Sequence, residues 1–229
     1  MRIPSHSSLV YVAAIGSLLA LCGYAIPADR SARTAAPAVK PALNLAKYQL
    51  DNGMIQTFAG GEVADPYFGL YSLSLAEKGG LDVTRVRAKF IQWALAEQKP
   101  DGTFDRYCKK SNAWVRCGKA DSDDANLVRW THLLYASAPA GRPLPDAWQK
   151  SATSAEKVLM SMRMKNGIFS VFRPGTPGYD GYALFKDNVE VMSMFRQTAD
   201  VLALRGDSAR AAEYTRRADD LHQAMKSEF

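Results

Sequence analysis

Two kinds of helical pattern alternate along this chain of 229 residues. In the first kind, apolar residues form a single stripe at alternating steps of three and four, which is typical of a surface helix with one buried side. This pattern occurs at 83–93, 148–162 and 211–225. In the second kind, apolar residues lie on most sides of the helix, which favours a position inside the fold. This pattern occurs in "YFGLYSLSL" (67–75), "LVRWTHLLY" (127–135) and "VEVMSMFRQTADVLAL" (189–204).

Short turns marked by Gly or Pro, such as "AEKGGLD" and "ALRGDS", join the two kinds of helix in pairs. This alternation predicts an all-α fold, with helical hairpins arranged as a partial α/α toroid or solenoid of inner and outer helices. The expected inner helices are 66–78, 122–137 and 188–204, and the expected outer helices are 82–98, 146–164 and 208–227. Because no run of alternating β-branched residues is present, we expect at most short strands at the "DGTF" turns.

A similar turn precedes each hairpin. Its three copies are "DNGMI" (51–55), "PDGTF" (100–104) and "KNGIF" (165–169). Self-similarity of this kind indicates a fold built from repeated units. We therefore expect one domain of three helical hairpins over residues 47–229.

The N-terminal segment has a different character. Arg2 and His6 precede an apolar run that ends in small residues, which predicts a signal peptide over 1–28 rather than a retained membrane anchor. The Ala- and Pro-rich residues 29–46 predict a flexible linker. A lipid attached to Cys22 is the alternative to a free mature chain, for which we predict no membrane span. The expected location is the periplasm or the exterior of the cell.

Cys108 and Cys117 are the two cysteines that would remain after removal of the signal peptide, and both lie in the loop "DRYCKKSNAWVRC". In a chain predicted to reach an oxidising compartment, such a pair favours a disulfide. A zinc site is the alternative, but His132 and His222 lie in helical patterns without ligand spacing to either cysteine.

Composition and motifs exclude several classes of function. The net charge of +6 comes without a dense Lys/Arg run, so we expect no nucleic acid as a partner. Phosphate-binding and dinucleotide-binding glycine motifs are missing, as is the G-x-S-x-G turn, so we expect no cofactor. The acids of "DSDDAN" (121–126) lack the spacing of an EF-hand, so we expect no metal, with a calcium site as the alternative.

Pairs of acids stand at the starts of two inner helices. Asp121 and Asp124 recur 66 residues later as Asp187 and Glu190. One interpretation is purely structural, because an acid at the cap and another at the third helical position satisfy the free amides of a helix start. The other is functional, because the outer helices begin with single caps and the loops before the paired acids are long. The crowding of Asp123 against its neighbours should raise the pKa of one carboxyl.

At this point the chain resembles a family. The junction "WALAEQKPDGTF" (93–104) and the hairpin plan are similar to those of six-hairpin glycosidases. The resemblance implies that catalytic carboxylates lie at the starts of the inner helices. The candidates that it implies are Asp65, Asp121, Asp124, Asp187 and Glu190. Three hairpins are half of six, so the chain is either part of an enzyme or a short variant that stays open or closes by self-association.

Glycoside hydrolysis requires one protonated carboxyl group and one carboxylate. We therefore predict an exported glycoside hydrolase in which Asp124 and Glu190 are the catalytic pair, supported by Asp121 and Asp187. Flat aromatic rings suit sugar rings. The predicted substrate-binding residues are Asp65, Tyr107, Trp114, Tyr179 and Tyr182. The partner would be a polysaccharide or oligosaccharide; the alternative is a non-catalytic helical-repeat protein that binds a polysaccharide or a protein.

Overall fold

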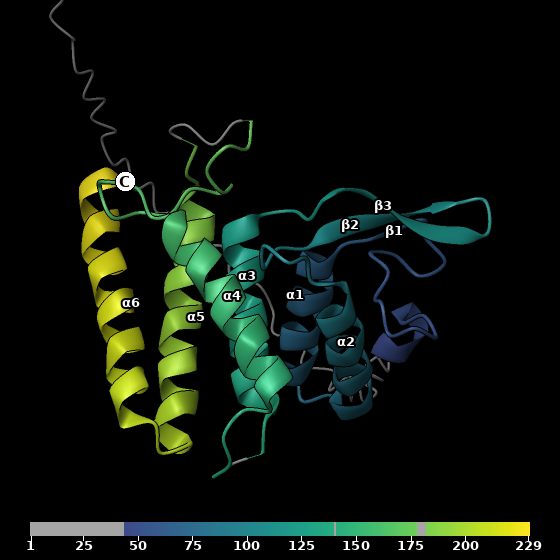
Figure 1. The fold of residues 1–229 in the computed structure, drawn as a ribbon, viewed down its shortest axis with the longest axis horizontal. Coiled ribbons are helices and arrows are strands. Elements are labelled where there is room, and N and C mark those ends of the chain that lie inside the picture. Colours follow the sequence, from purple (N-terminus) through teal and green to yellow (C-terminus); the bar gives the residue numbers. More distant parts are fainter. Residues whose placement is uncertain (1–43, 140, 178–181) are drawn as a thin grey trace, which may run out of the picture. The chain divides into compact units, whose positions relative to one another are not determined.

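A computed structural model of the chain describes residues 44–139, 141–177 and 182–229 (Figure 1). In this part of the chain, six α-helices form three hairpins, and a small sheet combines one strand before α1 with two strands between α2 and α3. The helices are α1 (Pro66–Lys78), α2 (Thr84–Glu97), α3 (Asp123–Ser137), α4 (Asp146–Ser161), α5 (Phe185–Leu204) and α6 (Ser208–Glu228). The predicted all-α class and its hairpin plan are confirmed.

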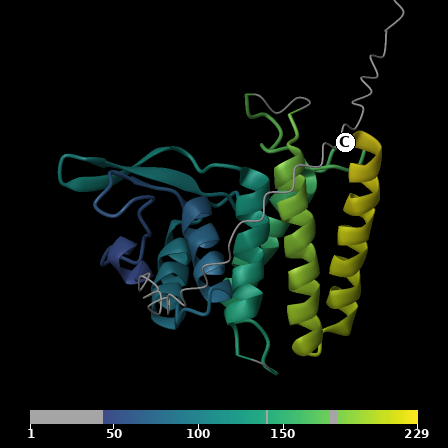
Figure 2. The ribbon, with the colours of Figure 1, turned by 180° about the vertical axis from the view of Figure 1, so that it is seen from behind.

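The inner helices stand in the order α1, α3 and α5, with α3 between the other two (Figure 1). Helix α3 packs against α1, α4 and α5, and α5 packs against α6. Helix α4 covers α3 in Figure 1, whereas Figure 2 presents α3 and α5 from the opposite side. Large side chains such as Trp130 of α3 and Phe195 of α5 are fully buried, as the apolar pattern on most sides of these helices predicts.

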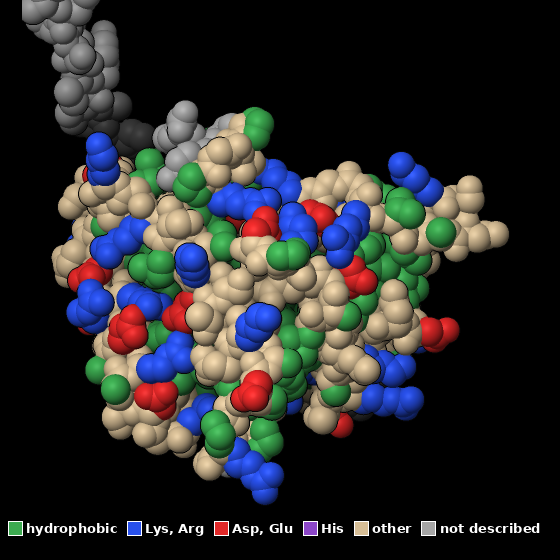
Figure 3. Space-filling view, in the orientation of Figure 1, with side chains coloured by type: hydrophobic (Ala, Val, Ile, Leu, Met, Phe, Trp, Pro, Cys, Tyr) green, Lys and Arg blue, Asp and Glu red, His purple; other side chains and the backbone are tan. Residues whose placement is uncertain are grey.

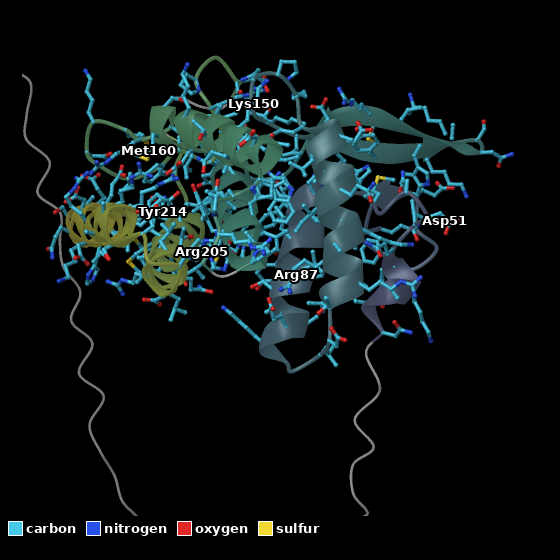
Figure 4. All side chains as sticks on the ribbon, turned by 60° about the horizontal axis from the view of Figure 1, so that its bottom comes forward. Asp51, Arg87, Lys150, Met160, Arg205 and Tyr214 are labelled. Carbon is cyan, nitrogen blue, oxygen red and sulfur yellow. A yellow bond between two sulfur atoms is a disulfide. The ribbon has the colours of Figure 1, made fainter. Side chains whose placement is uncertain are left out.

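Side-chain contacts join each outer helix to its neighbours through a few polar groups within the core. Trp130 donates a hydrogen bond from Nε1 to Ser151 of α4 at 2.9 Å. Tyr214 of α6 points toward α4, where its hydroxyl donates to Glu156 at 2.6 Å (Figure 4). The same carboxylate pairs with Arg217 at 2.7 Å. Charged groups between the outer helices are therefore paired.

The three repeated turns share one backbone conformation. Gly53, Gly102 and Gly167 have φ angles of 98°, 87° and 91°, a region open to glycine but strained for other residues. Each turn packs against the outer helix of the hairpin that follows. A β-carbon added at these three glycines would lie within 3 Å of Lys89 on α2, Ser154 on α4 and Ala224 on α6.

A long side chain holds each of these turns in the same way. Gln49 and Gln98 each donate to the carbonyl of the turn glycine, at 3.0 and 2.9 Å, and to a carbonyl of α2 or α4. In the third turn, Arg163 replaces glutamine and donates to Gly167 O at 3.3 Å. Asn188 then ties this turn to α5, because it both accepts from and donates to the backbone of Phe169.

The strands form a three-stranded antiparallel sheet in the order β1 (Val63–Ala64), β2 (Asp105–Lys110) and β3 (Ala113–Lys119). At the "DGTF" turn, where at most a short strand was expected, β2 begins directly after Phe104. The disulfide between Cys108 and Cys117 joins β2 to β3, with 5.6 Å between their Cα atoms. The β2–β3 hairpin is visible in Figure 1 above α1 and α2.

The predicted signal peptide (1–28) lies outside the described residues, as does most of the predicted linker (29–46). The described structure begins with a short 3-10 helix, Leu45–Tyr48, in which Leu45 is buried. This short helix spans the predicted boundary at residue 47. None of the helices in the described residues is both long enough and apolar enough to cross a membrane.

Candidate active site

The starts of α1, α3 and α5 lie at one end of the hairpins because each inner helix follows a turn or loop at that end (Figure 1). Lys, Arg, Asp and Glu side chains gather near the upper edge of Figure 3, where α3 meets the β2–β3 hairpin. Three of the acids selected from the sequence, Asp65, Asp124 and Asp187, are buried at the starts of these helices. We describe them from α1 to α5.

Asp65 caps α1 and joins three elements. Its Oδ1 accepts from the amide of Tyr67 at 3.0 Å, a cap bond at the start of α1. Its Oδ2 accepts from Arg106 Nε on β2 at 2.7 Å and from the amide of Asp121 at 3.0 Å. Burial raises the pKa of Asp65, and these donors only partly oppose it. Asp65 thus fixes the β2–β3 hairpin and the chain before α3 to the start of α1.

Ser122, Asp124 and Asp187 form the buried centre of the cluster. The Ser122 hydroxyl oxygen lies 2.8 Å from Asp124 Oδ1 and 3.0 Å from Asp187 Oδ2. Asp124 is fully buried, and its Oδ2 has no hydrogen-bond partner in the described residues. Burial raises the pKa of Asp124 well above its usual range, and the charge of Asp187 raises it further.

Glu190 lies one turn farther along α5 and is surrounded by donors. The Tyr67 hydroxyl is 3.1 Å from Glu190 Oε2, and Lys186 Nζ is 3.2 Å from Oε1. Arg129 of α3 approaches Oε1 at 3.5 Å and lies over the ring of Tyr71 on α1. Glu190 and Arg129 line a groove of about 220 Å³ between the three inner helices. This groove is the part of the cluster that opens to the surface of the inner helices.

Hydrogen bonding couples the titration of Tyr67 and Lys186. Lys186 Nζ donates to the Tyr67 hydroxyl oxygen at 2.8 Å. Burial raises the pKa of Tyr67 to about 12. For Lys186, burial alone would lower the pKa, but the bond to Tyr67 and the charge of Glu190 outweigh it, so the pKa rises. Lys186 therefore remains a cation beside the two acids of α5.

Cations and aromatic rings also border the outer side of the cluster. Arg173 forms an ion pair with Asp101 of the second turn and approaches Asp123 at 4.0 Å. Burial raises the pKa of Asp123. Lys119 of β3 lies 3.3 Å from the centre of the Phe172 ring. Phe172 in turn stacks on Tyr182, with their ring planes 8° apart.

The structure corrects the predicted caps. Asp121 does not cap α3, because the cap position belongs to Ser122, which has a left-handed backbone and no side-chain cap bond. Asp187 does not cap α5, because that helix begins at Phe185 and Asp187 is its third residue. Glu190 and Asp124 therefore stand at different distances from their helix starts. The nearest acidic neighbour of Asp124 across the helices is Asp187, through Ser122.

The predicted substrate-binding aromatics are dispersed. Tyr107 is buried against Trp93 and bonds to Glu97, so its ring supports the sheet. Trp114 lies near the far end of the β2–β3 hairpin, paired with Lys109. Tyr182 is 47% exposed beside the cluster. Tyr179 lies outside the described residues.

Sequence reasoning missed the donors around the acids. They are Tyr67, Arg106, Ser122, Arg129, Arg173 and Lys186. Ser122 and Lys186 stand directly beside selected acids in the sequence, and this adjacency is the signal that could have found them. Within the described ranges, His, Cys, Asp and Glu side chains form no group of three or more that could hold a metal ion.

The fold and this cluster define an α/α-hairpin protein with carboxylates gathered at the starts of its inner helices. No protein-family model and no curated protein sequence matches the chain. One similar solved structure is an unsaturated glucuronyl hydrolase, which has a six-hairpin glycosidase fold, in an aspartate-to-asparagine variant with the saccharide dGlcA-Glc-Rha-Glc. The TM-score is 0.52, the sequence identity is 13%, and the match covers 79% of this chain. The chain spans about half of that structure, 52% of its length.

Proposed function

We propose that this chain is an exported carbohydrate-active protein that hydrolyses a glycosidic bond at the starts of its inner helices. The observation that carries the proposal is the meeting of acids from two successive inner helices. Asp124 Oδ1 and Asp187 Oδ2, at 2.8 and 3.0 Å from the same hydroxyl oxygen, lie within 5.8 Å of each other. Retaining glycosidases hold their two carboxyl groups about 5–5.5 Å apart. The similarity to the glucuronyl hydrolase supports the proposal at the level of the fold.

The charges around the cluster favour an acidic saccharide as the substrate. Lys119, Arg173 and Lys186 border the acids, and a cation near a sugar carboxylate forms a charge-assisted hydrogen bond. The exposed ring of Tyr182 offers an apolar face to a sugar ring. The saccharide bound to the similar structure includes the residue written dGlcA, which fits this choice of substrate class.

Amide substitutions test the catalytic proposal. The release of new reducing ends from acidic and neutral polysaccharides is measured for the wild type and for Asp124→Asn, Asp187→Asn and Glu190→Gln. We expect the rate of reducing-end release to fall by at least 100-fold when the substituted residue acts as acid, base or nucleophile. Asp146→Asn is the matched control, because Asp146 is an exposed acid at the start of an outer helix, at the other end of the hairpin. If the wild type shortens no polymer, hydrolysis is the wrong function.

Binding without cleavage is the second candidate function. The observation that favours it is that the acids are buried or already paired. Asp124 is fully buried, and Asp187 and Glu190 both form ion pairs with Lys186. Calorimetric titration with acidic oligosaccharides separates the two functions. Saturable heat without product supports a binding protein, whereas product formation excludes a purely binding role.

We also propose export, with removal of residues 1–28. The disulfide between Cys108 and Cys117 supports it, because disulfides persist mainly in oxidising compartments. Cell fractionation and the intact mass of the mature chain test it. A mature chain that still begins at Met1 in the cytoplasm would contradict export, and a mass increase at Cys22 would identify a lipoprotein.

Self-association is the last part of the proposal. Exposed apolar side chains stand at both ends of the row of inner helices, with Phe68 and Leu75 on α1 and Phe185 and Phe229 beside α5 and α6. A second copy could cover the α1 end of one chain with the α5 end of the other, and three hairpins from each would equal six. Sedimentation of the mature chain at micromolar concentration tests this. A monomer over the whole range would contradict it.

A further inference from the structure

The buried contacts of Ser122 leave one proton unaccounted for. Ser122, Asp124 and Asp187 are 4%, 0% and 3% exposed, so bulk solvent covers little of their surface. A serine hydroxyl has a single hydrogen, and an ionised carboxylate only accepts. Ser122 can therefore donate to only one of its two carboxyl neighbours, at 2.8 and 3.0 Å. The other contact is a hydrogen bond only if that carboxyl group carries a proton and donates to Ser122 Oγ.

The surroundings determine which carboxyl group is protonated. Lys186 Nζ lies 3.3 Å from Asp187 Oδ1, so Asp187 has a positive charge beside it. No ion pair involves Asp124 in the described part of the chain, and the charged groups that face it are Asp187 from α5 and Asp123 from its own helix. Both are acids, and burial also disfavours a second charge at this position.

The backbone of Ser122 is consistent with a task for its hydroxyl group. Ser122 has φ 50° and ψ 78°, a left-handed conformation that is uncommon for residues other than glycine. It stands at the cap position of α3, yet its side chain makes no cap hydrogen bond. The hydroxyl group instead points to the two carboxyl groups. A serine used only to begin a helix would bond the free amides of the first turn.

We propose that Ser122 is a positioning residue that holds one proton between two buried carboxyl groups. Asp124 Oδ1, which also accepts from the Ala125 amide at 2.7 Å, carries the proton and donates to Ser122 Oγ, and Ser122 donates to the carboxylate of Asp187. Both hydrogen bonds can reverse their direction without any other reactant. The Asp124 proton moves to Ser122 Oγ while the Ser122 proton moves to Asp187 Oδ2, which leaves Asp124 charged and Asp187 neutral. If the proposed hydrolysis holds, this path returns a proton to Asp187 from a position that solvent does not reach.

Carbon-13 NMR of the full-length protein with labelled aspartate carboxyl groups tests this without any substrate. We expect one carboxyl carbon to keep the chemical shift of a neutral acid at pH 7, and to disappear from the spectrum in Asp124→Asn. A wild-type spectrum in which every aspartate is ionised at pH 7 would overturn the proposal. Because no saccharide is involved, failure of the hydrolysis assay leaves this result unaffected.

Two variants of Ser122 separate the hydroxyl group from the backbone. Ser122→Gly removes the hydroxyl group and suits the positive φ, whereas Ser122→Ala removes it and keeps the strain. We expect the titration midpoint of Asp124 to move by at least one pH unit in both variants. An unchanged midpoint in Ser122→Gly would refute the role of the hydroxyl group.

Asp124→Asn provides a further test if the serine variants fail to fold. An asparagine amide can donate to Ser122 Oγ as the neutral acid does, so we expect this variant to fold. In Asp124→Asn the Ser122 hydroxyl hydrogen should remain in slow exchange with water. A variant that folds but exchanges this hydrogen as fast as a surface serine would overturn the proposed bond direction.

Discussion

Replacement of Asp65 should show how strongly one buried carboxylate holds the candidate site together. Its side chain is 1% exposed and accepts three hydrogen bonds, from the amides of Tyr67 and Asp121 and from Arg106. Asp65→Ala removes a helix cap, which costs about 1 kcal/mol, and leaves the part-buried Asp121 amide and Arg106 side chain without this acceptor, at about 1 kcal/mol each. We therefore expect the free energy of unfolding to fall by about 3 kcal/mol in Asp65→Ala.

Asp65→Asn should cost less, about 1 kcal/mol, because the amide oxygen can still accept the cap bond. Burial already raises the pKa of Asp65, so loss of the charge also removes a desolvation cost. Urea unfolding followed by circular dichroism measures both variants. Asp82→Ala is the control, because Asp82 accepts a similar bond from Thr84 at 3.0 Å on an exposed surface. If Asp65→Ala loses no more than Asp82→Ala, the reasoning from burial is wrong.

Three further predictions concern the rest of the fold. Burial lowers the pKa of His132 from 6.5 to about 4, so the unfolded chain binds a proton in this window that the folded chain does not. The free energy of unfolding should therefore fall by on the order of 3 kcal/mol as the pH is lowered from 6.5 to 4. Urea unfolding of His132→Gln at a series of pH values should lack this contribution to the fall in stability with pH. Replacing Cys108 and Cys117 with serine should lower the free energy of unfolding by about 2–3 kcal/mol, since the closed loop is short; an unchanged urea midpoint would contradict it. Gly102→Ala places a β-carbon 2.7 Å from a backbone oxygen at φ 87° and should cost more than about 2 kcal/mol by thermal unfolding, whereas Gly141→Ala, at φ 69° in open space, should cost about 1 kcal/mol.

The periodicity of the sequence predicts the helices well because burial on one side or on most sides leaves a pattern in every turn. Helix α1 has the expected bounds, and α3 starts one residue later than expected. The largest differences are the end of α4, at Ser161 rather than 164, and the start of α5, at Phe185 rather than 188. There the acid Asp187 suggested a cap, but the preceding Leu184 holds that position without any side-chain bond. A cap made by the backbone alone leaves no mark in the sequence.

The candidate site is only partly predictable, because its contacts depend on side chains that are distant in sequence. Asp65 was selected as an acid at the start of an inner helix, yet its bond to Arg106 requires the β2–β3 hairpin to fold over α1. Tyr107 was selected as a loop aromatic, but the strand alternates its side chains, and this one faces the core. Ser122 carries no pattern of its own, since its conformation is fixed by the chain on both sides.

The glycine turns have a consequence for how such a chain can grow or shorten. Each turn packs against the outer helix of the hairpin that follows it. A turn and the two helices after it therefore form a unit that contains its own stabilising contacts. A gene that gained or lost one such unit would keep every remaining turn in contact with its own support. Duplication at the boundaries before Gln49, Gln98 and Arg163 would therefore be tolerated better than duplication between the two helices of a hairpin, which would separate a turn from the helix on which it rests.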